Sequence, residues 1–126
     1  GYFFSPVVVD ANKAGDGIGY GTATADAALS LKAAGGDATY ALNWLRANDR
    51  AGLSPGFTGE ARQRYAEGLR YYWAAVRRQT LGITTDLGPL QRADKSWRNS
   101  EPLVKEDDPL IATAFAVIAL SRSREP

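Results

Sequence analysis

The chain contains an internal repeat of helix-forming segments, and this repeat limits the possible folds more than any other feature of the sequence. Residues Thr22–Ala34 (TATADAALSLKAA) align with Ile111–Ser123 (IATAFAVIALSRS), with several alanines, a threonine and a leucine in register. A third segment, Tyr71–Leu81 (YYWAAVRRQTL), lies between them and is followed by glycine, as the alanine-rich part of the first is. The spacing is about 45 residues, the length of a two-helix unit. We therefore expect an all-α chain built from helical hairpins.

Local signals place the ends of these helices. Asp37 is suited to N-cap a short helix that reaches about Asn48 and carries Trp44 into the core. Three glycines and a proline predict a loop over residues 51–59. Apolar residues at helical spacing then predict one long helix from residue 60 to about residue 82.

The last helix has the sharpest predicted start. Asp107 and Asp108 precede Pro109, which favours the first helical position, and their charges suit the positive end of the helix dipole. The apolar run Leu110–Leu120 follows. It is shorter than the about 20 residues that span a bilayer as a helix, so we expect a buried core helix and no membrane span. Glycine and proline before it leave room for only a brief turn near Leu90.

Composition excludes several kinds of chemistry. The 126 residues suffice for one domain with one core. Because the chain has no cysteine and no histidine, it cannot supply a disulfide, a Ser-His-Asp triad or an HExxH zinc site. The net charge of +1 is far from the basic excess of a nucleic-acid-binding domain, so no nucleic-acid partner is expected. We expect no metal and no cofactor, and the compartment stays undetermined.

A motif near the last helix resembles that of a known family. The stretch Gln91-Arg-Ala-Asp94-Lys95-Ser-Trp97 is similar to the QxxDGSW repeat motif of squalene and oxidosqualene cyclases, with Lys95 in place of glycine. The Asp-Pro pair and the TAFAVIAL helix that follow resemble the same repeats. Together with the earlier glycine- and alanine-rich segments, the resemblance to the squalene-cyclase and prenyltransferase superfamily covers about residues 17–121.

The resemblance implies an α/α toroid, a ring of helical hairpins around a central, often apolar, cavity. This chain then corresponds to a partial α/α toroid of two to three helical hairpins with long loops. We expect a single domain over residues 1–126, with a first repeat at 17–58, a second at 59–97 and a last inner helix within 98–126. Because a partial toroid leaves the repeats at its two ends without a neighbour, we expect a homo-oligomer or contact with missing repeats.

The resemblance also suggests roles for particular residues. Gln91, Asp94 and Trp97 belong to a motif that is usually structural in the family, where glutamine caps helix ends and bonds toward the tryptophan. An inner helix carrying aromatic residues could line a cavity for an apolar or isoprenoid ligand, because π faces stabilise cations; the alternative is that these side chains are core. The candidate ligand-binding residues are Tyr71, Tyr72, Trp73 and Phe115, with Tyr20 a weaker candidate.

Catalytic residues of the family are missing. There is no DxDD acid, and the nearest carboxylate cluster, Lys105–Asp108, is explained by helix capping. The glycines of residues 17–21 after Val7–Val9 make a poor dinucleotide loop, and the segment that begins at Asp10-Ala-Asn12 lacks the ligands of a calcium loop.

Three functions stay open on the sequence. The first is a terpene-cyclase-like repeat domain that is not independently catalytic and acts in binding or assembly. The second is part of a polyprenyl cyclase or prenyltransferase whose acid lies outside this chain. The third is a carbohydrate-active or inhibitor-like α/α domain, because related toroids occur outside lipid chemistry.

Overall fold

The computed structural model describes residues 1–3, 13–15, 17–50 and 52–121. Those residues form helices and no strand, which confirms the all-α class. In chain order the elements are α1 (Gly21–Ala33), α2 (Thr39–Asn48), α3 (Gly59–Ala61), the π-helical segment η2 (Arg62–Glu67), α4 (Arg70–Leu81), the 3-10 turn η3 (Gly88–Leu90) and α5 (Pro109–Leu120).

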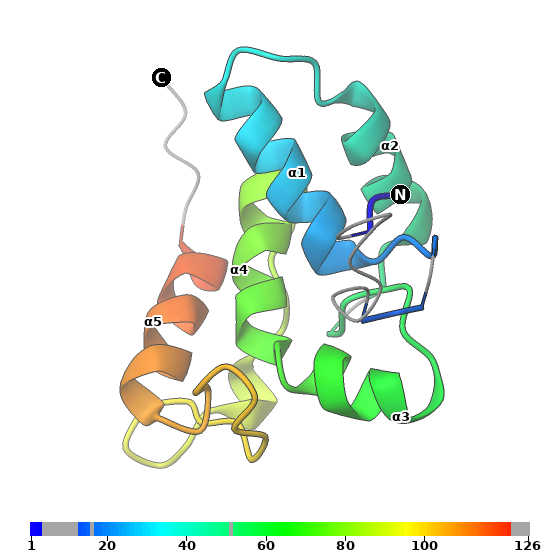
Figure 1. Cartoon of the computed structure of the whole chain (residues 1–126). Coiled ribbons are helices and arrows are strands. Elements are labelled where there is room, and N and C mark those ends of the chain that lie inside the picture. The colour runs from blue at the N-terminus through cyan, green and yellow to red at the C-terminus, as the bar shows by residue number, and fades with distance from the viewer. Residues whose placement is uncertain (4–12, 16, 51, 122–126) are drawn as a thin grey trace.

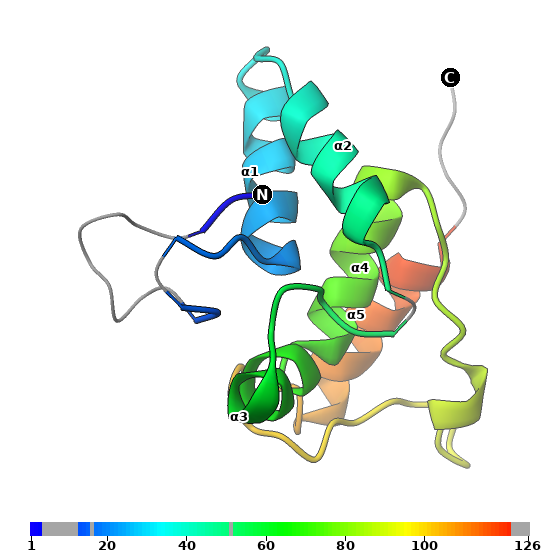
Figure 2. The ribbon, with the colours of Figure 1, turned by 90° about the vertical axis from the view of Figure 1, so that its right-hand side faces the viewer.

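Helix α4 is the centre of the arrangement. It packs against α5 on one side and against α1 on the other, and α2 pairs with α1 and also contacts α4 (Figures 1 and 2). A long irregular segment, residues 82–108, leads from the end of α4 to the start of α5. The chain thus forms two helical pairs, α1–α2 and α4–α5, while their closure into part of a ring stays a prediction.

Two separate apolar clusters cover the two sides of α4. Toward α5, Tyr71 packs with Trp97 and with the alanines of α5. Toward α1 and α2, the fully buried Trp73 packs with Ala25 and Leu45. Replacing a buried tryptophan by alanine typically costs 3–5 kcal/mol, so Trp73 is a principal contact between the two helical pairs.

The first and last helices hold matching threonines, as their alignment in the sequence suggests. The backbone N–H of Tyr2 donates to Oγ1 of Thr24 at 2.9 Å. The backbone N–H of Trp97 donates to Oγ1 of Thr113 at 3.0 Å. In both cases an aromatic residue from outside the helix is fixed by the same hydroxyl, so α1 and α5 are locally equivalent.

The predicted helix from residue 60 to residue 82 is wrong as one continuous helix, because side chains interrupt it. In a regular helix the N–H of Tyr71 would donate to the carbonyl of Glu67. Instead it donates to Glu106 Oε1 at 3.0 Å, and Asn99 Nδ2 donates to the Glu67 carbonyl at 2.6 Å. Asn99 also donates to Glu106 Oε1 at 3.1 Å. The two side chains therefore replace one helical hydrogen bond, and α4 begins anew after them.

The carboxylate of Glu106 caps the start of α4 from 35 residues away. Its second oxygen, Oε2, accepts from the N–H of Tyr72 at 2.8 Å. Glu106 is fully buried, and burial raises the pKa of its carboxyl, against the lowering effect of the backbone N–H donors. At the other end, α4 stops at Gly82, whose φ of 71° is the left-handed conformation that favours glycine, and this predicted end is confirmed.

Arg77 forms the second buried polar link. Its Nε and Nη2 donate to the two carboxylate oxygens of Asp49, which follows α2, at 2.8 and 2.7 Å. Its Nη1 donates to the Thr84 carbonyl and to Thr85 Oγ1. Arg77 therefore joins α4 both to the end of α2 and to the segment that leaves α4.

Several predicted helix ends agree with the structure and two details differ. Asp108 Oδ1 accepts from the N–H of Leu110 at 2.9 Å, so the predicted cap of the last helix is confirmed. The N-cap of α2 is Ala38, and Asp37 instead accepts from the N–H of Thr39 just inside the helix. Trp44 is only half-buried at the edge of the cluster around Trp73.

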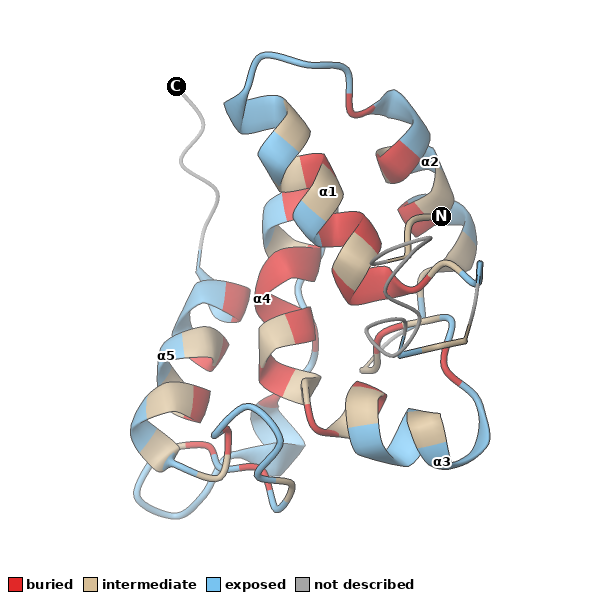
Figure 3. Ribbon diagram, viewed as in Figure 1, coloured by how far each residue is buried: buried red, intermediate tan, exposed pale blue. Residues whose placement is uncertain are grey.

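The prediction that residues 110–120 form a buried core helix is wrong. Only the small residues Ala112, Ala116 and Ala119 of α5 are buried, because they face α4. Four large aliphatic residues, Leu110, Val117, Ile118 and Leu120, are exposed, the first two at 77% and 59%. Figure 3 shows buried positions along one side of α5 only. Within the described residues no helix is long and apolar enough to cross a membrane.

We predict that replacing Glu106 destabilises the fold. In Glu106→Gln an amide N–H₂ must face one of the two backbone N–H groups, which should cost about 2 kcal/mol, and Glu106→Ala, which leaves both unpaired, about 3 kcal/mol. The free energy of unfolding from urea titration measures this. The control is Glu101→Gln, whose side chain makes no hydrogen bond within the described chain and which should change stability by less than about 0.5 kcal/mol. Equal effects of E106Q and E101Q would contradict the capping role.

The raised pKa of Glu106 also predicts the direction of a pH effect. Because the folded-state pKa lies above the ordinary value of 4.5, the folded chain binds the proton more tightly than the unfolded chain. The Glu106 contribution to stability is therefore full below pH 4.5 and is lost as the pH rises through the folded-state pKa. E106Q should flatten this decline in the unfolding free energy. A wild-type unfolding free energy that rises with pH above 4.5 would be inconsistent with a raised Glu106 pKa. The same decline in E106Q as in the wild type would be inconsistent with it as well.

Candidate functional site

The three consecutive aromatic residues of α4 lie in different surroundings. Tyr71 and Trp73 are buried, at 2% and 0% exposure, and belong to separate core clusters. Tyr72, between them, is half-buried and lies edge-on to Phe115 of α5, with ring centroids 5.5 Å apart. The structure thus brings together Tyr72 and Phe115 and places the other two candidates in the core. Tyr20, the weaker candidate, is buried against Phe57.

Asp26 of α1 completes a small cluster with these two rings. The Tyr72 hydroxyl donates a short hydrogen bond to Asp26 Oδ1, so side chains from α1, α4 and α5 meet at one place. Burial, with the carboxylate acceptor as a second cause, raises the pKa of the Tyr72 phenol well above its usual range. Burial also raises the pKa of Asp26. Because Asp26 accepts in this bond, the arrangement holds the phenol proton and does not present a strong acid.

The motif residues Gln91, Asp94 and Trp97 make local, structural contacts. Gln91 Nε2 donates to the Lys95 carbonyl at 2.9 Å, and Asp94 Oδ1 accepts from the N–H and hydroxyl of Ser96. These donors lower the pKa of Asp94. Trp97 is buried, and its Nε1 donates to the Leu87 carbonyl at 2.8 Å. The amide of Gln91 thus closes the motif's own turn and makes no hydrogen bond to Trp97.

Lys95 adopts the backbone conformation that glycine adopts most easily. Its φ is 74°, in the left-handed region where a Cβ is unfavourable. This is the position at which the motif of the cyclase family has glycine. Lys95 therefore occupies this turn at a cost in stability.

Two of the carboxylates near the last helix accept hydrogen bonds from the starts of helices. Glu106 caps α4, and Asp108 caps α5. Within the described ranges, no group of three or more His, Cys, Asp or Glu residues is placed to hold a metal ion. Val7–Val9 and the Asp10-Ala-Asn12 segment lie outside the described residues.

The sequence patterns do not identify the residues that hold the helices in place, nor Asp26, which lies beside the rings of Tyr72 and Phe115. Glu106 was attributed to helix capping together with its neighbours, but it caps a helix far away in the sequence. Asn99, Arg77 and Asp26 carried no motif. Asp26 interrupts an alanine-rich segment, whereas Asn99 and Arg77 stand beside other polar residues and give no such signal.

Comparison with family models, with curated proteins and with solved structures found no match to this chain. The resemblance to the cyclase superfamily accordingly stays a proposal that rests on the sequence motif alone.

We predict that Lys95→Gly stabilises the chain by about 1 kcal/mol, because it relieves a left-handed conformation that costs roughly 1–2 kcal/mol in a residue with a Cβ. The matched variant is Lys95→Ala, which removes the same charge and keeps the Cβ, and it should not stabilise. Thermal and urea unfolding of both variants measure the difference. Equal stabilities of K95G and K95A would show that the backbone conformation is not the cause.

Proposed function

We propose that this chain is a helical repeat domain of the terpene-cyclase-like type that is not independently catalytic and acts in assembly through α5. The observation that carries the proposal is the reversed polarity of α5, whose small residues face the core and whose large aliphatic residues face outward. An exposed, contiguous apolar surface of this kind is typical of a protein–protein contact.

The outer face of α5 is defined by Leu110, Ala114, Val117 and Ile118. These positions follow the spacing i, i+4, i+7 and i+8, which places them on one side of a helix. All four are exposed. No charged residue occurs between Pro109 and Leu120, so nothing on α5 itself opposes its burial.

The occupant we infer is a second copy of this chain, with the two α5 helices antiparallel. If they cross at Ala114, Leu110 of one lies opposite Ile118 of the other, and the small alanine allows close approach. The ends also match in charge: Asp107 lies opposite Ser121, whose carbonyl accepts from Arg78 Nε at 2.8 Å. The acidic start of one helix therefore meets a guanidinium at the end of the other, and antiparallel dipoles add to the attraction.

The size of the surface suggests a weak dimer. Helix α5 has 12 residues. It is therefore about 18 Å long, so the pair buries an area at the low end of specific interfaces. We expect a dissociation constant on the order of 10 μM.

An enzymatic role is the second candidate, favoured by the cluster of Tyr72, Phe115 and Asp26. Two aromatic rings beside a carboxyl could form part of the wall of a site for an apolar or isoprenoid ligand, with an acid supplied from outside this chain. Incubation of the purified chain with squalene and with prenyl diphosphates separates the two. Turnover by the chain alone would overturn the noncatalytic proposal.

We predict that the chain sediments at twice its 13.5 kDa mass at high concentration and that Val117→Glu makes it monomeric. The glutamate would be buried without a partner at the interface, while in the monomer it stays in water. The control is Ile83→Glu, another exposed apolar residue that lies outside α5. Sedimentation equilibrium of the three proteins measures the effect. A monomeric wild type, or a dimer that V117E leaves intact, would contradict the proposal.

A further inference from the structure

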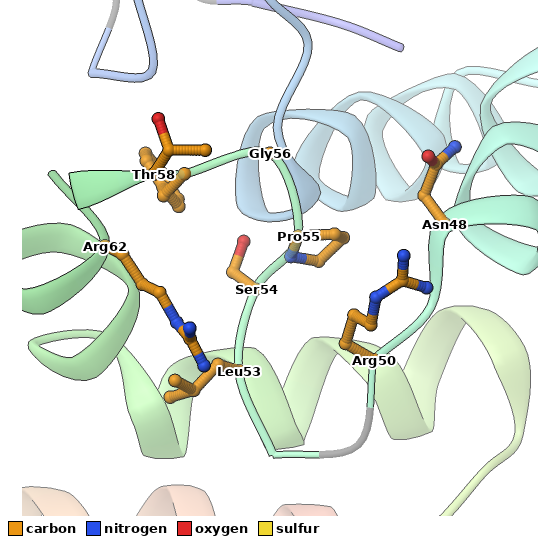
Figure 4. Close-up of a pocket in the computed structure, with 9 residues that line it drawn as sticks. Asn48, Arg50, Leu53, Ser54, Pro55, Gly56, Thr58 and Arg62 are labelled. Atoms are coloured by element: carbon orange, nitrogen blue, oxygen red, sulfur yellow. The ribbon is translucent and has the colours of Figure 1, made fainter.

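A cavity of about 340 Å³ lies between the end of α2 and the start of η2, far in the sequence from α5. Residues 53–58, which precede α3, line it. Figure 4 shows Arg50 on one side and Arg62 on the other, with Ser54 and Pro55 between them. Two guanidinium groups from separate elements therefore border one concavity.

The ionisable residues that line this cavity are both positively charged. Among its lining residues Arg50 and Arg62 are the only ionisable ones, and no carboxylate is present. The neighbouring Asp49 already accepts hydrogen bonds from Nε and Nη2 of Arg77, so its charge is compensated. The guanidinium of Arg62 makes no ion pair or hydrogen bond with any residue that the structure describes, and that of Arg50 contacts only the Asp49 carbonyl, at 3.3 Å.

A buried hydroxyl adds a donor to the cavity. Ser54 is 4% exposed, and its Oγ accepts from the backbone N–H of Thr22 at 3.1 Å. Its own proton has no acceptor among the described residues. A serine hydroxyl can donate once while accepting, so Ser54 still offers an O–H to a ligand in the cavity.

We propose that this cavity binds the phosphate group of a small molecule. Guanidinium groups bind phosphate oxygens through charge-assisted hydrogen bonds, and a concave site raises the local attraction for an anion. Arg50 and Arg62 supply positive charge from opposite sides of the cavity, and Ser54, which lies between them, can add a hydroxyl donor. This site is independent of the α5 contact, so either can fail without the other.

The residues that line the cavity also indicate what else the ligand carries besides its phosphate group. Leu53 and Phe57 line the same cavity beside the arginines. Its volume lies at the lower end of ordinary ligand pockets. The phosphate can come from inorganic phosphate or from a monoester with a small apolar body, and the apolar walls contact only the second.

The test is calorimetric titration of the full chain with inorganic phosphate and with phenyl phosphate, at low salt. We expect both to bind, and Arg50→Gln and Arg62→Gln each to weaken binding about tenfold. The matched control is Arg46→Gln, an exposed arginine of α2 outside the cavity that should leave the affinity unchanged. Circular dichroism checks that the variants keep their helices.

The outcomes separate clearly. Tighter binding of phenyl phosphate identifies a monoester as the ligand class, and equal affinities identify the free anion; both support a phosphate site. Absence of binding by either probe up to about 20 mM, far above the range of a specific site, overturns the proposal. Equal losses in R46Q, R50Q and R62Q would overturn it as well, because they would indicate attraction by net charge alone.

Discussion

The structure depends on the two side chains that enter the chain's central helix. Glu106 and Asn99 take the place of the hydrogen bond between Tyr71 and Glu67, and so they fix both where α4 begins and where the segment after it runs. Because Glu106 lies only three residues before α5, the same contact also anchors the start of the last helix. A buried carboxylate is unfavourable unless its oxygens are satisfied, and here backbone and amide donors supply that satisfaction.

The position of α4 then determines what the other helices expose. Its two faces are already occupied by large aromatic residues, Tyr71 toward α5 and Trp73 toward α1. Helix α5 can approach the face that carries Tyr71 only through small side chains, and Ala112, Ala116 and Ala119 provide them. Since α5 otherwise consists mostly of aliphatic residues, the side that carries Leu110, Ala114, Val117 and Ile118 is apolar and exposed. The proposed assembly through α5 is thus a consequence of how α4 is packed.

The sequence predicted the local features of the fold well, because those depend on neighbouring residues. The cap at Asp108, the end of α4 at Gly82 and the turn before Gln91 all follow from short-range preferences for aspartate, glycine and proline. The helix over residues 60–82 was predicted as continuous because the residues that interrupt it, Asn99 and Glu106, lie about 30 residues later and leave no local sign.

Burial was harder to predict than secondary structure. The apolar run of α5 indicated a core helix, yet hydrophobicity alone does not tell which side of a helix finds a partner. The three aromatic candidates of α4 show the same difficulty. Because Tyr71, Tyr72 and Trp73 are consecutive, they point to different sides of the helix and cannot all line one cavity. Arg50 and Arg62 border the same cavity through the path of residues 53–58, and their spacing in the sequence carries no recognisable motif.

The most direct test of the account is a cysteine placed at the point where the two α5 helices are inferred to cross. The chain has no cysteine, so an Ala114→Cys variant carries a single thiol. In a symmetric antiparallel dimer the two thiols face each other and mild oxidation should convert most of the protein to a disulfide-linked dimer. Ser30→Cys, an exposed position on α1, gives the rate for random encounters. An antiparallel α5 dimer predicts much faster linkage of A114C than of S30C, and equal rates would contradict it.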